Sequence, residues 1–255
     1  MEWFWYIYIG TAGLALGSFY NVMGLRWTQG ESVVHPRSAC PSCGHTLRTG
    51  ELIPVFSYLV QRGRCRSCGS RISPMYPGIE LLTGLLFLAA AVSTGLTWEL
   101  PVALLLISML MVSIVTDLTE TLILDRVLLL FGVPLLILRL TAASLEPWWD
   151  ALLGAGAGFT LLLLIAILSK GGMGGGDIKL YAVLGAALGF VPMLLSLFLA
   201  ALFGLAGTLL LHAKQRIQRK MEVPFGPYIA AGAVTAYFFG SDLLQWYTGL
   251  LTMGQ

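Results

Sequence analysis

Residues 170–190 read "KGGMGGGDIKLYAVLGAALGF", and this stretch decides how the second half of the chain is divided. A glycine run ends at Asp177, and a long apolar sequence follows directly. A carboxylate beside a membrane-like segment is costly, so it points to a function. As one helix, residues 178–211 would be ~50 Å long, which is too long for a single ~30 Å membrane core. Gly189 and Pro192 offer a break, so we predict two segments here.

The composition indicates an integral membrane protein. The 255 residues are 57% hydrophobic and 11% charged, and the mean hydropathy is +0.82, far above the range of soluble domains. The first apolar run starts at Trp3 without a basic region before it, so we interpret it as a retained helix rather than a cleaved signal. The expected surroundings are a lipid bilayer, and no nucleic-acid partner is expected.

The apolar pattern predicts an all-α polytopic membrane protein with about eight transmembrane helices. If the N-terminus lies outside, the inside segments hold every basic residue except Arg139, as the positive-inside tendency requires. Both termini are then outside, and the run "HAKQRIQRK" at 212–220 is interpreted as a topology anchor at anionic headgroups rather than a partner-binding site. The expected helices are 3–25, 79–97, 101–116, 126–141, 151–168, 178–190, 192–211 and 225–247.

One soluble-looking stretch, 27–78, separates a first helix at 1–26 from a predicted seven-helix domain at 79–255. It contains two C-x-x-C pairs, a spacing that fits a tetrahedral Cys₄ zinc site whose knuckles each turn at the following glycine. Metal binding would stabilise a domain too small for a large core. The alternative is a thiol-redox carrier, which a cytosolic location disfavours. His35 and His45 are interpreted as surface residues, and the predicted ligands are Cys40, Cys43, Cys65 and Cys68.

Two carboxylates stand at the inside ends of separate predicted spans. Asp117 closes the third span in "VSIVTDLTETLILD" and Asp177 opens the sixth. Alone, each could be a helix cap or a solvated helix end. As a pair they could share one proton, so that one accepts a proton from water while the other donates to a substrate carbonyl. This is aspartyl-protease chemistry at the membrane boundary.

The glycines before Asp177 would let a substrate backbone approach closely, because they carry no side chain. These residues are Gly174, Gly175 and Gly176. A phosphate-binding loop is disfavoured, because no strand precedes the run and the G-K-[ST] ending is missing. A flexible linker and a transporter with coupled carboxylates stay open as alternatives.

Four blocks in order resemble the bacterial type IV prepilin peptidases, which are leader peptidases, N-methyltransferases and G-x-G-D aspartyl proteases of the membrane. These are "GSFYNVMGLRW" at 17–27, the cysteine-containing stretch at 40–84, "GGMGGGDIKLYAVLGAALG" at 171–189 and "VPFGPYIAAG" at 223–232. The resemblance implies that Asp117 and Asp177 are the catalytic pair. The family often has Ile-Pro-Asp where this chain has Ile123, Leu124 and Asp125, which keeps Asp125 open as an alternative to Asp117.

The resemblance also implies the substrates and the location. They would be type IV prepilins or pseudopilins, with a basic leader inside and an apolar helix in the bacterial cytoplasmic membrane. Cleavage would follow a glycine at the cytosolic boundary, and S-adenosylmethionine would methylate the new N-terminus. Whether the substrates serve pili, secretion or DNA uptake, and in what oligomeric state the chain acts, does not follow from the sequence.

Overall fold

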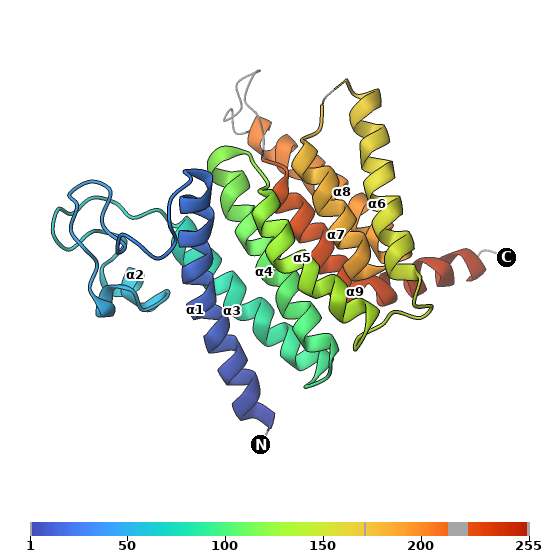
Figure 1. The fold of residues 1–255 in the computed structure, drawn as a ribbon, viewed down its shortest axis with the longest axis horizontal. Coiled ribbons are helices and arrows are strands. Elements are labelled where there is room, and N and C mark those ends of the chain that lie inside the picture. The colour runs from blue at the N-terminus through green and yellow to red at the C-terminus, as the bar shows by residue number, and fades with distance from the viewer. Residues whose placement is uncertain (1, 171, 214–223, 254–255) are drawn as a thin grey trace. The chain divides into compact units, whose positions relative to one another are not determined.

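The computed structural model describes residues 2–170, 172–213 and 224–253 (Figure 1). Most of the basic run at 212–220, including Lys214, Arg216, Arg219 and Lys220, lies outside the described residues, and so does Gly171 of the glycine run. The predicted topology anchor therefore stays a prediction.

The described residues form an all-helical fold, as predicted. Eight long helices coincide with the eight predicted apolar segments, and two short helices lie in the loop after the first. Among the described residues the only β pairing is a pair of isolated antiparallel bridges. The elements are α1 (Glu2–Thr28), η1 (Thr49–Glu51), α2 (Phe56–Val60), α3 (Met75–Thr94), α4 (Glu99–Glu120), α5 (Asp125–Leu140), α6 (Asp150–Leu168), α7 (Gly175–Leu188), α8 (Phe190–Ala213) and α9 (Gly226–Met253).

Four of the described helices are long and apolar enough to cross a membrane: α3, α4, α6 and the part of α8 up to Leu210. By contrast, α5 and α7 have 16 and 14 residues, which is short of the ~20 residues of a straight crossing. The eight predicted helices are thus present, and four of them are candidate membrane spans.

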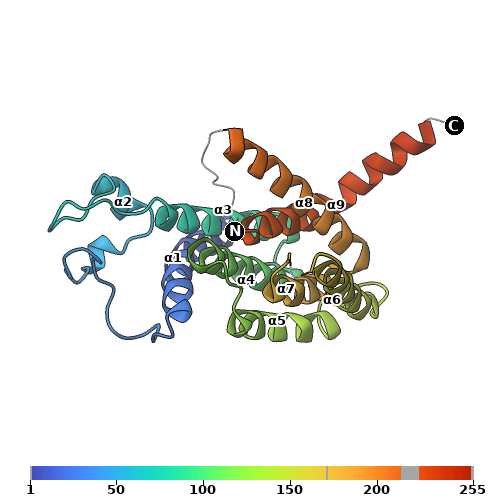
Figure 2. The same cartoon turned by 90° about the horizontal axis from the view of Figure 1, so that it is seen from above.

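The contacts divide the chain into two compact units, Met1–Thr119 and Glu120–Gln255. In the first unit, α1 packs along α3 (Figures 1 and 2). The helices approach closely at Gly17, where a Cβ would lie 2.8 Å from the Cα of Glu80. Small residues at such crossings favour helix association in membranes. The Tyr20 hydroxyl also donates to Ser108 Oγ of α4 at 2.6 Å.

The loop between α1 and α3 is tied to α3 by a buried carboxylate. Glu80 Oε2 accepts the backbone N–H of Val55 at 2.7 Å, and Glu80 is only 9% exposed. Val55 has a φ of 61°, which is unusual for a β-branched residue. A hydrogen bond of this kind contributes roughly 0.5–1.5 kcal/mol, and it holds the start of α2 against the first turns of α3.

In the second unit, α7 packs against α5, α6 and α8, and α8 packs against α9. Glycines set the α6–α7 crossing: a Cβ on either Gly154 or Gly185 would overlap the backbone of the other. Gly158 approaches the carbonyl of Tyr181 in the same way. The crossing therefore requires glycine on both helices, and it fixes how α7 lies in this unit.

The predicted break between residues 178 and 211 is confirmed at Gly189. This residue has a φ of +85°, where glycine is favoured, and α8 begins at the next residue. Asp150, at the start of α6, accepts the backbone N–H of Phe190 at 3.3 Å. A carboxylate from a distant helix therefore satisfies the first free N–H of α8, where the helix dipole favours negative charge.

Candidate functional site

Asp177 lies in the first turn of α7. Gly174 is the N-cap residue, and the backbone N–H of Asp177 bonds to its carbonyl at 3.2 Å. Asp177 is therefore the third residue of the helix and not its N-cap, which was the structural alternative to a catalytic role. The side chain is half-buried, and the helix N-terminus favours the ionised carboxylate.

The three glycines before Asp177 have different surroundings. A Cβ on Gly175 would meet nothing within 4 Å, and one on Gly174 would meet only the Asp177 carboxylate, with Oδ2 at 3.3 Å. At Gly176 the space is already filled, because a Cβ would lie 2.8 Å from the Ile123 Cβ and 3.0 Å from the Ile123 carbonyl oxygen. Open backbone is thus present at Gly174 and Gly175, whereas Gly176 packs against the segment before α5.

Asp117 lies inside α4 rather than at a solvated end. The helix continues to Glu120, beyond the predicted end at 116, and Asp117 is 6% exposed. It belongs to the first unit, whereas Asp177 belongs to the second.

Asp125, the alternative to Asp117, begins α5 and forms an ion pair with Lys179 of α7. The Lys179 Nζ lies 2.7 Å and 2.8 Å from the two carboxylate oxygens. Both side chains are more than half exposed, and exposed pairs of this kind contribute about 0–1 kcal/mol. Lys179 follows Asp177 by two residues on α7, so the two side chains point to different faces of this helix. The sequence alone did not suggest the pairing.

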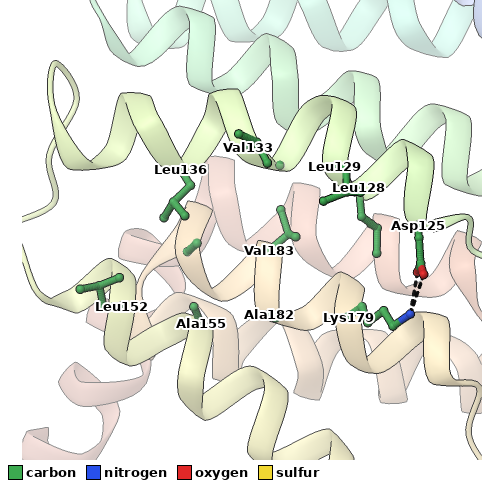
Figure 3. Close-up of a pocket in the computed structure, with 12 residues that line it drawn as sticks. Asp125, Leu128, Leu129, Val133, Leu136, Leu152, Ala155, Lys179, Ala182 and Val183 are labelled. Carbon is green, nitrogen blue, oxygen red and sulfur yellow. Dashed lines mark hydrogen bonds and ion pairs between the residues drawn. The ribbon is translucent and has the colours of Figure 1, made fainter.

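An apolar groove starts at this ion pair. It runs between α5, α6 and α7 and has a volume of about 440 Å³ (Figure 3). Leucines and valines form much of its walls, and alanines and a glycine between them would allow a helix to approach closely. Its lining includes Asp125, Gly132, Ala155, Lys179, Ala182 and Ala186.

The four cysteines form the predicted cluster. Their Sγ atoms all lie within 4.8 Å of one another, and the cross-knuckle pairs Cys40–Cys68 and Cys43–Cys65 are 3.9 Å and 4.0 Å apart. A tetrahedral ion with Zn–S bonds of ~2.3 Å needs sulfur atoms ~3.8 Å apart. All four are free thiols, and the donor set therefore fits a single tetrahedral metal ion.

The two knuckles have the same backbone. In each, the first cysteine accepts the N–H of the glycine that follows the second, at 2.9 Å, and that glycine is left-handed: Gly44 at +70° and Gly69 at +73°. This confirms the predicted role of both glycines. The knuckles differ in the residues that flank them.

The surroundings of the thiols shift their pKa values in different directions. A hydrogen bond with the Ser70 hydroxyl, followed by backbone hydrogen bonds, lowers the pKa of Cys40 to about 6. A backbone hydrogen bond at His45 lowers the pKa of Cys43, but burial and the other thiols together raise it to about 12. Four thiolates this close repel one another, and a bound cation removes that repulsion. His45 is not in the cluster, because its Nε2 pairs with Glu51 at 3.2 Å.

Residues 11–94 match the family model described as the bacterial peptidase A24 N-terminal domain, and residues 104–209 match the one described as the type IV leader peptidase family. A prepilin leader peptidase/N-methyltransferase of Bacillus subtilis is 45% identical over 240 residues, covering 92% of this chain and 94% of the relative. The chain belongs to the type IV leader peptidase family.

Further members of the family are more distant. Prepilin leader peptidase/N-methyltransferases of Aeromonas salmonicida and Pseudomonas aeruginosa are 38% and 37% identical, covering 83% and 85% of this chain and 74% and 76% of the relatives. No solved structure matches the chain. Together with the apolar helices, membership of this family indicates an integral membrane protein and does not support the transporter or thiol-carrier alternatives.

Proposed function

We propose that this chain is a membrane aspartyl endopeptidase that removes the leader from type IV prepilins or pseudopilins and then methylates the new N-terminus. The observation that carries the proposal is the match to leader peptidases over nearly the whole chain. The surroundings of Asp177, in the first turn of α7 behind the open backbone of Gly174 and Gly175, support it.

Asp117 and Asp177 are the proposed catalytic residues. The ionised member takes a proton from water as the water oxygen attacks the scissile carbonyl carbon, and the protonated member gives its proton to the carbonyl oxygen. When the resulting diol collapses, the C–N bond breaks and the amine nitrogen takes up a proton. The leader leaves as a carboxylic acid and the mature chain gains a free N-terminus.

Asp117 is preferred to Asp125 for the first position. Asp125 is exposed and already paired with Lys179, whereas Asp117 is buried within a candidate span.

The groove between α5, α6 and α7 is the proposed site for the apolar helix of the substrate. It begins at Lys179, near the N-terminal end of the helix that carries Asp177, and its alanines and glycine interrupt walls of leucine and valine. A substrate helix in this groove would bring the residues before it toward the first turn of α7.

The second proposed reaction uses S-adenosylmethionine as a substrate. The nitrogen of the free amine attacks the methyl carbon and the C–S bond breaks, leaving S-adenosylhomocysteine and, after loss of one proton, a methylated N-terminus. The relatives are named for both activities.

Zinc is the proposed metal at Cys40, Cys43, Cys65 and Cys68, because a closed set of four thiolates suits a structural zinc ion. The ion would join the two knuckles and stabilise the proposed domain at 27–78, which follows a first helix at 1–26 and precedes a seven-helix peptidase domain at 79–255. Its role there is structural, and no reaction step passes through it.

The proposed location is the bacterial cytoplasmic membrane, with eight crossings and both termini outside. The positive-inside tendency supports this topology, since it puts the cysteines and both aspartates on the cytosolic face. The short helices α5 and α7 would then cross where the bilayer is locally thinned, which would let water reach Asp177.

A single incubation tests both activities. Purified protein is mixed with a prepilin, with and without S-adenosylmethionine, and both products are weighed by mass spectrometry. We expect cleavage after the leader glycine in both samples and a mass increase of one methyl group only with S-adenosylmethionine. An intact prepilin in both samples would contradict the proposal.

A further inference from the structure

The two cysteine knuckles differ in the residues that face each other beside the metal ligands. In the first knuckle, Ala39 pairs with Thr46 in an antiparallel bridge; in the second, Arg64 pairs with Arg71. The positions are equivalent: each bridge joins the residue before the first cysteine to the third residue after the second. Like charges directly opposite each other are destabilising, so the Arg64–Arg71 bridge is less stable than the uncharged bridge of the first knuckle.

These two arginines line a pocket of about 530 Å³ together with a third arginine. All three are exposed, and no ion pair to a carboxylate involves them within the part of the chain that the structure describes. A bound anion would compensate the repulsion between them. The lining includes Tyr58, Arg62, Arg64, Arg71, Ser73 and Pro74.

Exposed apolar side chains stand beside the pocket. Phe56, Leu59 and Val60 of α2 are 60%, 65% and 54% exposed, and Tyr58 of the same helix lines the pocket. Three large apolar residues left in water on the helix that also carries Tyr58 are typical of a surface that enters the headgroup region of a membrane.

The pocket also ends where a candidate membrane span begins. Ser73 and Pro74 line it, and α3, which is long and apolar enough to cross a membrane, starts at Met75. The first unit contains all of these residues. The arginines therefore lie next to one end of a span, the depth at which lipid phosphates are found.

We propose that this arginine pocket binds the phosphate of an anionic phospholipid headgroup, while Phe56, Leu59 and Val60 insert among the neighbouring lipids. The charge excludes a basic peptide as the occupant, because three arginines would repel it. Lipid binding would hold the cysteine-containing loop on the membrane surface. This proposal is independent of the peptidase activity and of the identity of the bound metal.

The test variant replaces the two bridge arginines of the second knuckle by the residues found at the equivalent positions of the first knuckle. In the full-length protein, the double substitution Arg64→Ala and Arg71→Thr gives the second bridge the residues of the first. The control, Arg37→Ala with Arg48→Ala, removes two exposed arginines of the same loop that do not line the pocket. Native mass spectrometry in neutral detergent measures binding of added phosphatidylglycerol, with phosphatidylcholine as the uncharged comparison, and metal content checks that each variant is folded.

The wild type and the control are expected to bind phosphatidylglycerol in preference to phosphatidylcholine. Each arginine near a membrane surface contributes enough to change affinity ~5-fold, so the pocket variant should bind phosphatidylglycerol ~25-fold more weakly. Equal losses in the pocket and control variants would overturn the proposal, as would unchanged binding. A parallel titration with inorganic phosphate separates the sources: tight, pocket-dependent binding of free phosphate without lipid selectivity would also overturn it. Should the double variant lose its metal, Arg62→Ala provides the same comparison.

Discussion

Single alanine substitutions of the glycines before Asp177 distinguish space that a substrate would occupy from space that the chain's own packing already fills. Gly175→Ala adds a methyl group that meets nothing within 4 Å. Alanine also favours the helix over glycine by roughly 0.5–1 kcal/mol. This variant should therefore fold at least as stably as the wild type.

Gly176→Ala has the opposite expectation for stability. Its Cβ would lie 2.8 Å from the Ile123 Cβ, whereas carbon atoms in contact are ~3.5–4.0 Å apart. Relieving an overlap of that size costs roughly 1–3 kcal/mol, which outweighs the gain in helix propensity. A lower midpoint of thermal unfolding in detergent is expected for Gly176→Ala and not for Gly175→Ala.

The cleavage activity of Gly175→Ala then tests whether the open backbone serves the substrate. If a substrate backbone passes against Gly175, the added methyl group should cost ~2–3 kcal/mol in the transition state and lower kcat/KM for prepilin cleavage by roughly 30- to 160-fold. The assay is the rate of leader release by purified protein. A stable Gly175→Ala variant with wild-type kcat/KM would refute the role assigned to this open backbone.

Three other substitutions probe the rest of the account. Gly154→Ala should lower the stability of the second unit by roughly 1–3 kcal/mol, because the added Cβ overlaps α7. Gly156→Ala should not lower it, because a Cβ at Gly156 meets nothing within 4 Å. Equal midpoints of thermal unfolding for the two variants would contradict the glycine-mediated crossing. Cys65→Ser should reduce bound metal from about one ion per chain to almost none, because a structural site needs its full ligand set; a variant with full metal content by elemental analysis would argue against a Cys₄ site. If the groove holds the substrate, Ala182→Trp, which fills the groove, should raise KM for prepilin about tenfold. That change is equivalent to roughly two lost methylene contacts at ~0.8 kcal/mol each. The control Ala201→Trp, on an exposed face of α8, should leave KM unchanged.

Local patterns in the sequence were sufficient to predict the helices and the cysteine cluster. Apolar runs located each long helix, with the largest error at the end of α9, which extends to Met253 rather than to 247, and Gly189 ended α7 where the length of the run required a break. The C-x-x-C spacing likewise determines a knuckle, because both ligands and the left-handed glycine lie within five residues.

The contacts that could not be predicted join residues far apart in the chain. Asp150 caps a helix forty residues later, and Ile123 fills the space at Gly176. The pairing of Arg64 with Arg71 needed the register of the second knuckle, which spacing alone does not reveal. Such contacts depend on how helices and turns pack, and a pattern within one segment carries no information about its distant neighbour.

The central claim is that Asp117 and Asp177 together perform the cleavage, and paired asparagine variants test it most directly. Asp117→Asn and Asp177→Asn are purified from membranes beside Asp125→Asn, the exposed control that pairs with Lys179, and leader release from a prepilin is followed by mass spectrometry. We predict no detectable cleavage by either of the first two variants, and cleavage by Asp125→Asn with a kcat close to that of the wild type, any loss appearing in KM because Asp125 lines the proposed substrate groove. Full cleavage by Asp117→Asn or Asp177→Asn, or its loss in Asp125→Asn alone, would contradict the assignment.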